Sequence, residues 1–343
     1  MQTPMRATTS FLGAAACPSS AAMAGKLTEA KPVMAVVFRN LRRCILMDVL
    51  VKLRIVRKLR DKELLNLEMK KLLLLTGLVL LSAFSPRKQL TWVAIGDSIT
   101  YHNGKPWATK NRLTKGYMDD VVQKLPYIHF TNQGYGGWTA KTMADNIDKI
   151  GLEKADIYTI FLGTNDWWTN LPIGTLDDYR NNTGNGTVCG AYRTIINKIR
   201  GLNSTATIIL LTPLQRTDFV DVNDSTSVIY GCYKPNKSGL FLSDYATAIG
   251  DIAYMERFEL VDLYHNSGIT IKNAVKFRRL RNPNTGAYKN YPYPDYTVIP
   301  YNPKTDEYPY PLAAIDMTYD GLHPSDKGHK RIADMLVEVM KED

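Results

Sequence analysis

Short apolar runs recur along residues 90–343, and amphipathic or polar segments lie between them. Each run is short, contains β-branched or aromatic residues and ends near glycine, proline or a polar residue, which is typical of a buried strand. The predicted strands are residues 90–96, 127–131, 155–163, 206–213 and 258–264. The intervening and final segments predict helices at residues 115–124, 139–149, 187–200, 242–257 and 325–341.

This alternation predicts an α/β fold in which helices cover both faces of a five-stranded, mainly parallel sheet. The crossover connections are expected to be right-handed. In such sheets, ligands bind beyond the carboxyl ends of the strands. The residues that directly follow each strand are therefore the first place to look for chemistry.

One segment of this region departs from the alternation. Residues 278–319 are rich in Tyr, Pro and Asn and show little apolar periodicity. The segment is too long for an ordinary connection between two elements. We expect an ordered surface insertion, with a short hairpin as an option, and its role as a lid or a fixed wall stays open.

Residues 69–85 differ from the rest of the chain. Two lysines follow Met69, an apolar run extends from Leu72 to Leu81, and small residues come next. This is the layout of a secretory signal peptide, and the run is short for a membrane span. It predicts a secreted or periplasmic protein with no membrane span in the mature form. A buried core helix and a retained membrane anchor are alternatives, whereas no cysteine follows the run to suggest a lipoprotein.

Most of the net positive charge lies before the predicted domain. Residues 1–85 contain 14 Lys and Arg against 5 Asp and Glu, a net charge of +9 out of +10 for the chain. Because a signal peptide begins a protein, we interpret Met69 as the true start and residues 1–68 as an upstream segment outside the mature protein. Alternatively, residues 39–62 form a basic amphipathic helix on an anionic membrane. Residues 86–343 are almost neutral, so no nucleic-acid partner is predicted.

Two of the four cysteines, Cys189 and Cys232, fall in the predicted mature domain. A disulfide between them is plausible in an oxidising compartment, but sequence does not show that they are close in space. A disulfide bridge and a pair of buried free thiols are therefore alternative predictions. No CxxC or His/Cys cluster indicates a metal site.

Polar residues follow the first three predicted strands. Ser98 comes directly after Gly96 and Asp97, and its hydroxyl needs a base in reach to become a nucleophile. After the second strand, a glycine-rich turn that includes Gly137 presents backbone N–H groups. After the third strand, Asn165 offers a side-chain amide, and donors of these kinds hold a developing oxyanion. Singly, each feature also fits an ordinary turn or helix cap.

A base and its orienting carboxylate stand near the end of the chain. Asp320 precedes His323 by three residues, and an aspartate that accepts the Nδ1–H of a histidine fixes its tautomer. His102 is a rival base close to the candidate serine, but it has no evident local carboxylate. Of the other histidines, His129 is expected to be packed in a strand, and His265 and His329 are expected to be exposed.

Four blocks carry a resemblance to a known family. GDS at 96–98, NQGYGGWT at 132–139, GTND at 163–166 and DGLHP at 320–324 resemble the conserved blocks of the SGNH (GDSL-type) hydrolase superfamily. The resemblance covers about residues 90–343. It implies a flavodoxin-like three-layer α/β/α sandwich and serine-dependent ester hydrolysis without a metal or other cofactor.

The resemblance also implies a role for each matching residue. Ser98 matches the nucleophile, His323 the general base and Asp320 the third member of the triad. The backbone N–H groups of Ser98 and Gly137 and the amide of Asn165 match the oxyanion hole. The small family members have no counterpart of the 278–319 insertion, which leaves the substrate open.

Aromatic residues suggest the substrate class. Trp167 and Trp168 follow Asn165 closely, and aromatic faces at a site mouth suit sugar rings, although rings of this kind also serve to pack loops. We expect a small-molecule or glycan ester as the substrate, and deacetylation of a carbohydrate as the reaction. A lipase, lysophospholipase or thioesterase is the alternative among hydrolases. A non-catalytic glycan-binding module on the same fold is the alternative outside them.

Overall fold

The computed structural model describes residues 41–53, 62–83 and 88–341. The chain divides into two compact units, Met1–Pro86 and Arg87–Asp343, and each is described by itself.

In the first unit, residues 41–53 are helical and α3 spans Lys62–Ala83. One helix thus includes the apolar run of the predicted signal peptide. The described helices lack the combination of length and apolarity that a membrane crossing needs. The remainder of the predicted upstream segment, at 1–40 and 54–61, and the predicted cleavage zone at 84–85 lie outside the described residues.

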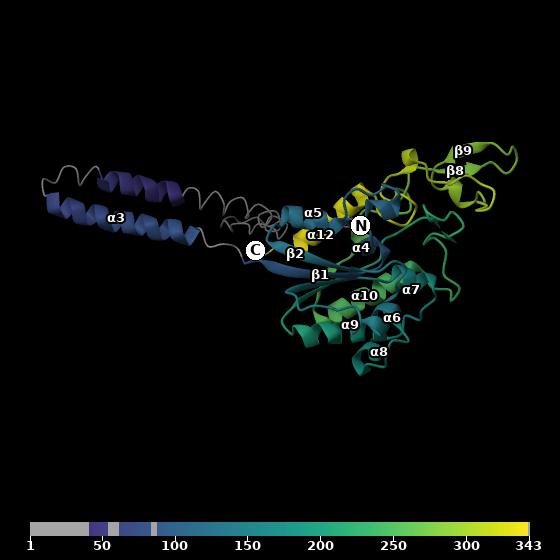
Figure 1. The fold of residues 1–343 in the computed structure, drawn as a ribbon, viewed down its shortest axis with the longest axis horizontal. Helices are drawn as coiled ribbons and strands as arrows, with labels where there is room; N and C mark the ends of the chain where they lie inside the picture. Colours follow the sequence, from purple (N-terminus) through teal and green to yellow (C-terminus); the bar gives the residue numbers. More distant parts are fainter. Residues whose placement is uncertain (1–40, 54–61, 84–87, 342–343) are drawn as a thin grey trace, which may run out of the picture. The chain divides into compact units, whose positions relative to one another are not determined.

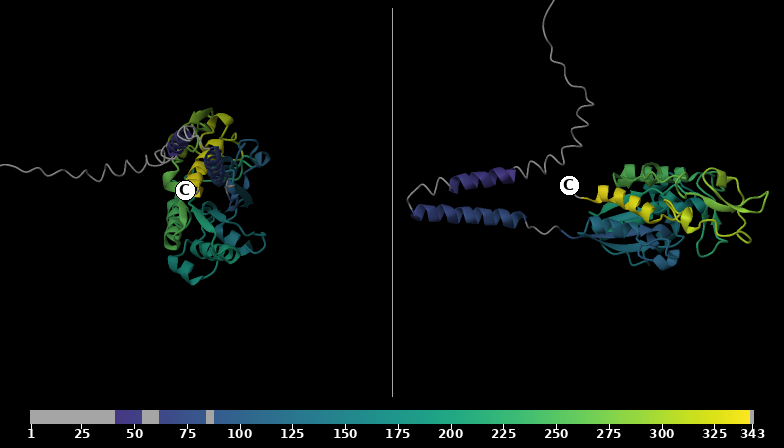
Figure 2. Two further views of the ribbon diagram at one scale, coloured as in Figure 1. Left: turned by 90° about the vertical axis from the view of Figure 1, so that its left-hand side faces the viewer. Right: turned by 90° about the horizontal axis from the view of Figure 1, so that it is seen from above.

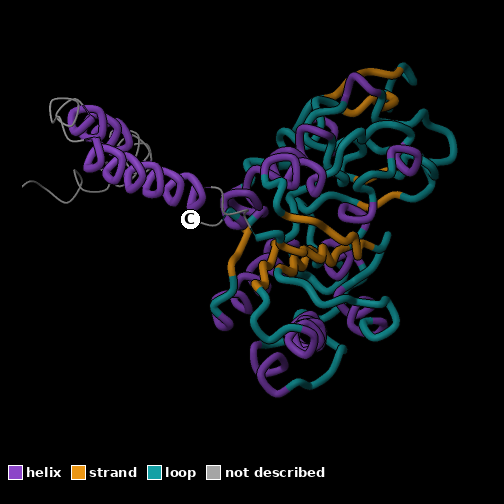
Figure 3. Tube along the Cα trace, turned by 60° about the vertical axis from the view of Figure 1, so that its left-hand side comes forward, coloured by secondary structure: helices purple, strands orange, loops and turns teal. Residues whose placement is uncertain are grey.

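The second unit is built around a five-stranded sheet (Figures 1 and 3). Its strands are β1 Leu90–Gly96, β2 Ile128–Gly134, β3 Ile157–Phe161, β4 Thr207–Leu211 and β7 Glu259–Val261. The order across the sheet is β2-β1-β3-β4-β7, and all neighbouring pairs are parallel. This is the flavodoxin-like order, so the predicted fold class is confirmed.

Helices cover both faces of the sheet (Figure 1). On one face lie α5 Tyr117–Lys124 and α12 Asp326–Met340. On the other lie α6 Ala140–Asn146, α8 Leu176–Asn181, α9 Val188–Leu202 and α10 Leu242–Glu256. The sheet is therefore the middle layer of three, as the resemblance implies.

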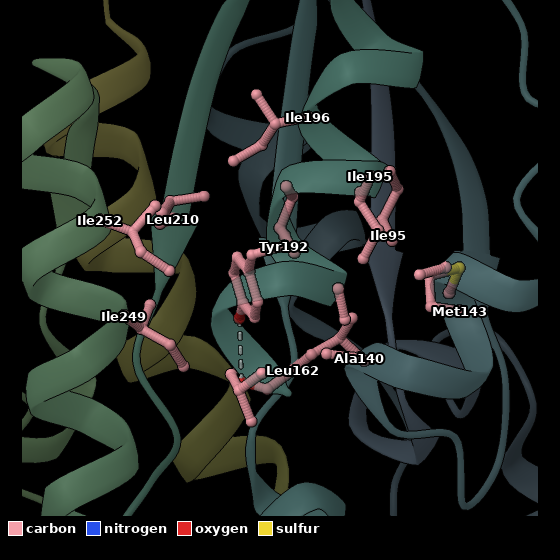
Figure 4. Packing of buried hydrophobic residues seen from close by; sticks show 14 of the residues in the cluster. Ile95, Ala140, Met143, Leu162, Tyr192, Ile195, Ile196, Leu210, Ile249 and Ile252 are labelled. Atoms are coloured by element: carbon pink, nitrogen blue, oxygen red, sulfur yellow. Dashed lines mark hydrogen bonds between the residues drawn. The ribbon is translucent and has the colours of Figure 1, made fainter. Parts of the chain in front are cut away.

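Each face of the sheet has its own hydrophobic core because side chains alternate along a strand. In β1, Trp92 belongs to the core beneath α5 and α12, whereas the next residue, Val93, belongs to the opposite core. Figure 4 shows part of this second core, where Tyr192 Oη donates a hydrogen bond of 3.3 Å to the carbonyl of Leu162. Burial on both faces explains why the central strands read as continuous apolar runs.

The predicted strands and helices are all present, with boundaries shifted by no more than three residues. The largest shift among the strands that bear on the site is at β2, which extends to Gly134 because Asn132 and Gln133 pair with Ala94 and Ile95 of β1. These polar residues read as a turn in the sequence, yet their backbone belongs to the sheet.

Residues 278–319 form the expected insertion with a hairpin. β8 Arg278–Arg281 pairs antiparallel with β9 Tyr288–Tyr291, and two short 3-10 helices follow, η2 Asp295–Thr297 and η3 Leu312–Ala314. In Figure 2 the insertion lies at the end of the unit opposite to the last turn of α12. Met340, at the end of α12, lies near Leu90 and Thr207, which begin β1 and β4, so the insertion lies at the carboxyl end of the strands.

A buried ion pair fastens the insertion to the chain that follows β4. The Arg278 side chain is 2% exposed and lies 2.5 Å from an Asp218 carboxylate oxygen. Tyr310 Oη donates to the Asp218 carbonyl, and Tyr233 Oη donates to the other carboxylate oxygen at 2.6 Å. Removing one partner of such a buried pair is strongly destabilising, so the insertion is an integral part of the folded unit.

The structure answers four expectations about individual side chains. Cys189 and Cys232 are free, buried thiols, so the option of a disulfide between them is excluded. His129, expected to be packed, is exposed on β2. His329, expected to be exposed, is buried on α12 with 1% exposure. His265 is exposed as expected.

Candidate active site

A sharp turn at the carboxyl end of β1 places Ser98. The strand ends at Gly96, and the short helix α4, Ser98–Tyr101, begins two residues later. The buried Asp97 carboxylate caps this helix by accepting a backbone N–H at 2.9 Å. A side chain at Gly96 would put its Cβ 2.1 Å from Thr100 Oγ1. Glycine at 96 therefore lets the helix pack tightly on the strand end, where the half-buried Ser98 begins it.

Ser98, His323 and Asp320 form one hydrogen-bonded chain. His323 Nε2 lies 2.8 Å from Ser98 Oγ, and His323 Nδ1 lies 2.7 Å from Asp320 Oδ2. The second carboxylate oxygen, Asp320 Oδ1, accepts the backbone N–H groups of Leu322 at 3.0 Å and of His323 at 2.7 Å. These bonds fix the turn, and the structure brings this local pair to Ser98, which lies 225 residues before His323 in the sequence.

Electrostatics prepare His323 to take a proton. Burial lowers the pKa of His323, but the charge of Asp320 and its hydrogen bond outweigh burial and raise that pKa above its usual value of 6.5. Because Asp320 accepts the proton on Nδ1, the neutral ring presents Nε2 as an unprotonated acceptor toward the serine hydroxyl. The arrangement has the nucleophile, base and orienter relation that covalent catalysis needs.

The turns after β2 and β3 lie against each other and against the end of β1. The N–H of Tyr135 donates to the Gly96 carbonyl at 3.0 Å. Asn165 Nδ2 donates to the Trp138 carbonyl at 3.0 Å. These contacts place the turn that holds Gly137 and the short helix α7, Thr164–Trp168, which holds Asn165, beside the Ser98 turn at the carboxyl ends of β1, β2 and β3.

Gly137 and Asn165, the two predicted oxyanion donors outside the Ser98 turn, each retain an available N–H. Gly137 has φ of +75°, a conformation that side chains disfavour, and its amide makes no hydrogen bond within the described part of the chain. Asn165 uses one amide hydrogen on Trp138 and keeps the second. The residue set can therefore stabilise a negative oxygen next to Ser98, as an acyl-transfer site requires.

The comparison with known families agrees with this geometry. Residues 94–331 match the model of the GDSL-like lipase/acylhydrolase family. The chain belongs to this family. No curated relative matches the chain.

Solved structures resemble this acylhydrolase over most of the second unit. A crystal structure of a possible lipase from Chitinophaga pinensis is 51% identical, covers 73% of this chain and 97% of its own, and gives a TM-score of 0.72. A Lactobacillus plantarum protein is 21% identical, with coverages of 74% and 97% and a TM-score of 0.49. A catalytic mutant of an acetylxylan esterase from Geobacillus stearothermophilus is 18% identical, with coverages of 75% and 96% and a TM-score of 0.42.

Aromatic rings that sequence reasoning did not connect with the site enclose His323 in this GDSL-like acylhydrolase. Phe219 meets the imidazole edge-on with ring centroids 5.3 Å apart, and Tyr319 stacks on it at 5.7 Å. The ring of His102 lies 4.9 Å away. The sequence signal for Tyr319 was its position next to Asp320, whereas nothing local marked Phe219.

His102 has no carboxylate partner that would orient it as a base. Its Nδ1 lies 3.2 Å from the hydroxyl of Tyr319, which is no carboxylate. Burial, followed by the charges of His323, His329 and Lys105, lowers the pKa of His102 to about 3. The geometry therefore favours His323 over His102 as the base, although the His102 ring lies beside the triad.

The two predicted substrate-binding tryptophans differ in exposure. Trp167 is 0% exposed and donates its indole N–H to the Leu240 carbonyl at 3.0 Å, so its assignment to the substrate is wrong and its ring is part of the core. Trp168 is half-buried and meets Tyr230 edge-on at 5.1 Å. Adjacent helical positions point in different directions, which explains why one ring is covered and the other reaches the surface.

Proposed function

We propose that this acylhydrolase is a serine esterase that removes acetyl groups from a carbohydrate through an acyl-enzyme on Ser98. The observation that carries the serine mechanism is the continuous chain from Ser98 Oγ through His323 to Asp320, with distances of 2.8 Å and 2.7 Å. A binding module would have no need for this aligned set of nucleophile, base and carboxylate.

The reaction follows from the positions of these groups. His323 Nε2 takes the hydroxyl proton as Ser98 Oγ bonds to the ester carbonyl carbon, and the carbonyl electron pair moves onto its oxygen. The N–H groups of Ser98, Gly137 and Asn165 hold that oxyanion. When the bond to the alcohol breaks, His323 gives the proton to the leaving oxygen. Water then attacks the acyl-enzyme by the same steps and releases the acid and free Ser98.

Exposed aromatic side chains support a carbohydrate as the alcohol part. Trp107 is 68% exposed on η1, Pro106–Thr109, which follows the nucleophile helix after a short turn. Trp168 adds a partly exposed ring after β3. Flat amphipathic rings offer large contact faces with little side-chain entropy to lose, and the apolar faces of sugar rings fit such surfaces.

We also propose that residues 69–85 direct export and that the mature protein begins after them. The lysines and apolar run of this segment support the proposal. The test is N-terminal sequencing of the protein recovered outside the cytoplasm of an exporting host. A first residue near 84–90 supports export with cleavage, and an intact residue 1 contradicts it.

A fluorophosphonate probe tests the serine mechanism directly. The wild-type protein should be labelled, and Ser98→Ala should lose both labelling and turnover of a chromogenic acetyl ester. Ser204→Ala, an exposed serine between α9 and β4, is the matched control and should keep both. Absent wild-type labelling favours the glycan-binding module, and labelling that survives in Ser98→Ala moves the nucleophile elsewhere.

A substrate panel tests the carbohydrate assignment separately. Acetylated polysaccharides and short acyl esters should be hydrolysed faster than esters of long-chain acids. A preference for long acyl chains contradicts deacetylation and favours a lipase or lysophospholipase, while acyl thioesters in the same panel test for a thioesterase.

A further inference from the structure

His102 has no part in the acyl-transfer steps described above, yet it lies at the triad. It follows α4 directly and is half-buried, and its ring centroid lies 4.9 Å from that of His323. Its Nδ1 has a hydrogen bond within the described residues, whereas no bond is found there for its Nε2, which is left for water or a bound molecule.

The hydroxyl of Tyr319 determines which nitrogen of His102 carries the proton. Tyr319 is 1% exposed, and its hydroxyl makes one hydrogen bond among the described residues, to His102 Nδ1 at 3.2 Å. A buried phenol needs an acceptor for its O–H, so Tyr319 donates and Nδ1 accepts. In the neutral ring the proton then resides on Nε2. Burial, followed by the charge of His323, lowers the pKa of His102 to about 3. The ring is therefore neutral.

The contact between His102 and His323 is the reason to expect His102 on the alcohol side of the ester. His323 must reach the leaving oxygen to return the proton, so the alcohol lies next to the His323 ring. The predicted oxyanion donors come instead from the turn after β2, for Gly137, and from the short helix after β3, for Asn165. A donor beside His323 is therefore expected nearer to the alcohol than to the acyl group.

We propose that His102 is a specificity-determining residue whose Nε2–H donates a hydrogen bond to a free hydroxyl next to the esterified carbon of a polyol or sugar. The inference rests on the proposed esterase function and deepens it. The recognised class is the acetyl ester of a vicinal diol, and Tyr319 is a positioning residue that selects the donating tautomer.

The test compares two acetyl esters that differ in this hydroxyl, 1,2-cyclohexanediol monoacetate and cyclohexyl acetate. For His102→Phe, which keeps an aromatic ring beside His323, kcat/KM for the diol ester should fall about 10-fold relative to the simple ester, the size of one net hydrogen bond. His102→Gln, which keeps a side-chain N–H donor, should restore part of the ratio. Tyr319→Phe keeps the ring stacked on His323 and should lower the ratio in the same direction.

The control histidine is His129, which is exposed on β2. His129→Phe should leave the ratio of the two esters unchanged. An unchanged ratio in His102→Phe overturns the inference, whether the two rates fall together or not at all, because a structural role affects both esters alike. If the wild type hydrolyses neither ester and takes no fluorophosphonate, the proposed function fails as well, whereas labelling with an unchanged ratio rejects the His102 role alone.

Discussion

Asp166 joins the short helix after β3 to the helix that follows the glycine turn, because its Oδ1 accepts the backbone N–H of Ala140 at 2.8 Å. Ala140 is the first residue of α6, and Asn165, the proposed oxyanion donor, directly precedes Asp166. One buried carboxyl group therefore sets the spacing of the two loops that supply Gly137 and Asn165.

Asp166→Asn should increase stability at alkaline pH and have little effect at acid pH. Asp166 is 0% exposed, and burial raises its pKa to about 7. An ordinary aspartate in the unfolded chain has a pKa of about 3.9. Between pH 3.9 and pH 7, roughly, Asp166 therefore holds a proton in the folded state that it has lost in the unfolded state. Wild-type stability therefore falls as pH rises through this window, and asparagine, which keeps the acceptor, removes this loss.

Urea unfolding at pH 5 and pH 8 measures this effect. The gain of Asp166→Asn over wild type should be larger at pH 8, and a gain that does not depend on pH contradicts the assignment. Asp166→Ala should lower both stability and kcat, because it removes the acceptor for Ala140 as well as the charge.

Asn165→Ala should reduce kcat by about 10²–10³-fold with little change in KM, because an oxyanion donor acts mainly in the transition state. The measurement is steady-state hydrolysis of an acetyl ester. Asn146→Ala is a matched control, since Asn146 Nδ2 also donates to a carbonyl, that of Thr142 at 2.9 Å, but at the end of α6. A raised KM with an unchanged kcat would show that Asn165 binds the ground state instead.

The pH profile of kcat/KM should report His323. The base must be neutral, so activity should fall as pH drops through its pKa, which lies above 6.5. In Asp320→Asn the charge that raises this pKa is gone while burial, which lowers it, remains. The acid limb should therefore move to lower pH, and kcat should fall about 10⁴-fold because the tautomer is no longer fixed.

The control for this profile is Asp316→Asn, because the Asp316 carboxylate pairs with Lys327 at 2.6 Å rather than with the triad. It should keep the wild-type acid limb. An acid limb that stays in place in Asp320→Asn would mean that a group other than His323 governs the profile.

The sheet and the triad residues were readable from the sequence because each depends on local pattern. The apolar runs of β1, β3 and β4 are buried on both faces, so their signal is strong, and Asp320 and His323 lie within one turn. Glycine at 96 marks the tight approach of Thr100 to the strand end. These features need no knowledge of distant contacts.

Features that depend on tertiary contacts could not be predicted from the sequence. Trp167 and Trp168 look equivalent, but packing buries only the first completely. Phe219 touches His323 from a segment more than 100 residues away in the chain, without a local signal. His329 lies among charged residues in the sequence, yet it occupies the face of α12 that packs on α5.

The contact of His329 with α5 should make the enzyme sensitive to acid. His329 Nδ1 accepts the backbone N–H of Tyr117 at 3.1 Å, and the two rings stack at 5.9 Å. Burial lowers the pKa of His329 to about 3, whereas an unfolded histidine has a pKa of about 6.5. The unfolded chain therefore binds a proton that the folded one does not, and stability should fall as pH drops from 6.5 toward 3.

His329→Gln keeps an acceptor for Tyr117 but does not titrate. Its free energy of unfolding should therefore fall less steeply with acid than that of wild type, by up to about 1.4 kcal/mol per pH unit between pH 6 and 4. Urea titrations across this range measure the slope, whatever the absolute stability of the variant. His129→Gln, a change at the exposed ring on β2, should keep the wild-type slope. Equal slopes for His329→Gln and wild type would contradict this prediction. They would mean that His329 binds a proton as readily in the folded enzyme as in the unfolded chain, so that acid does not act through the bond to Tyr117.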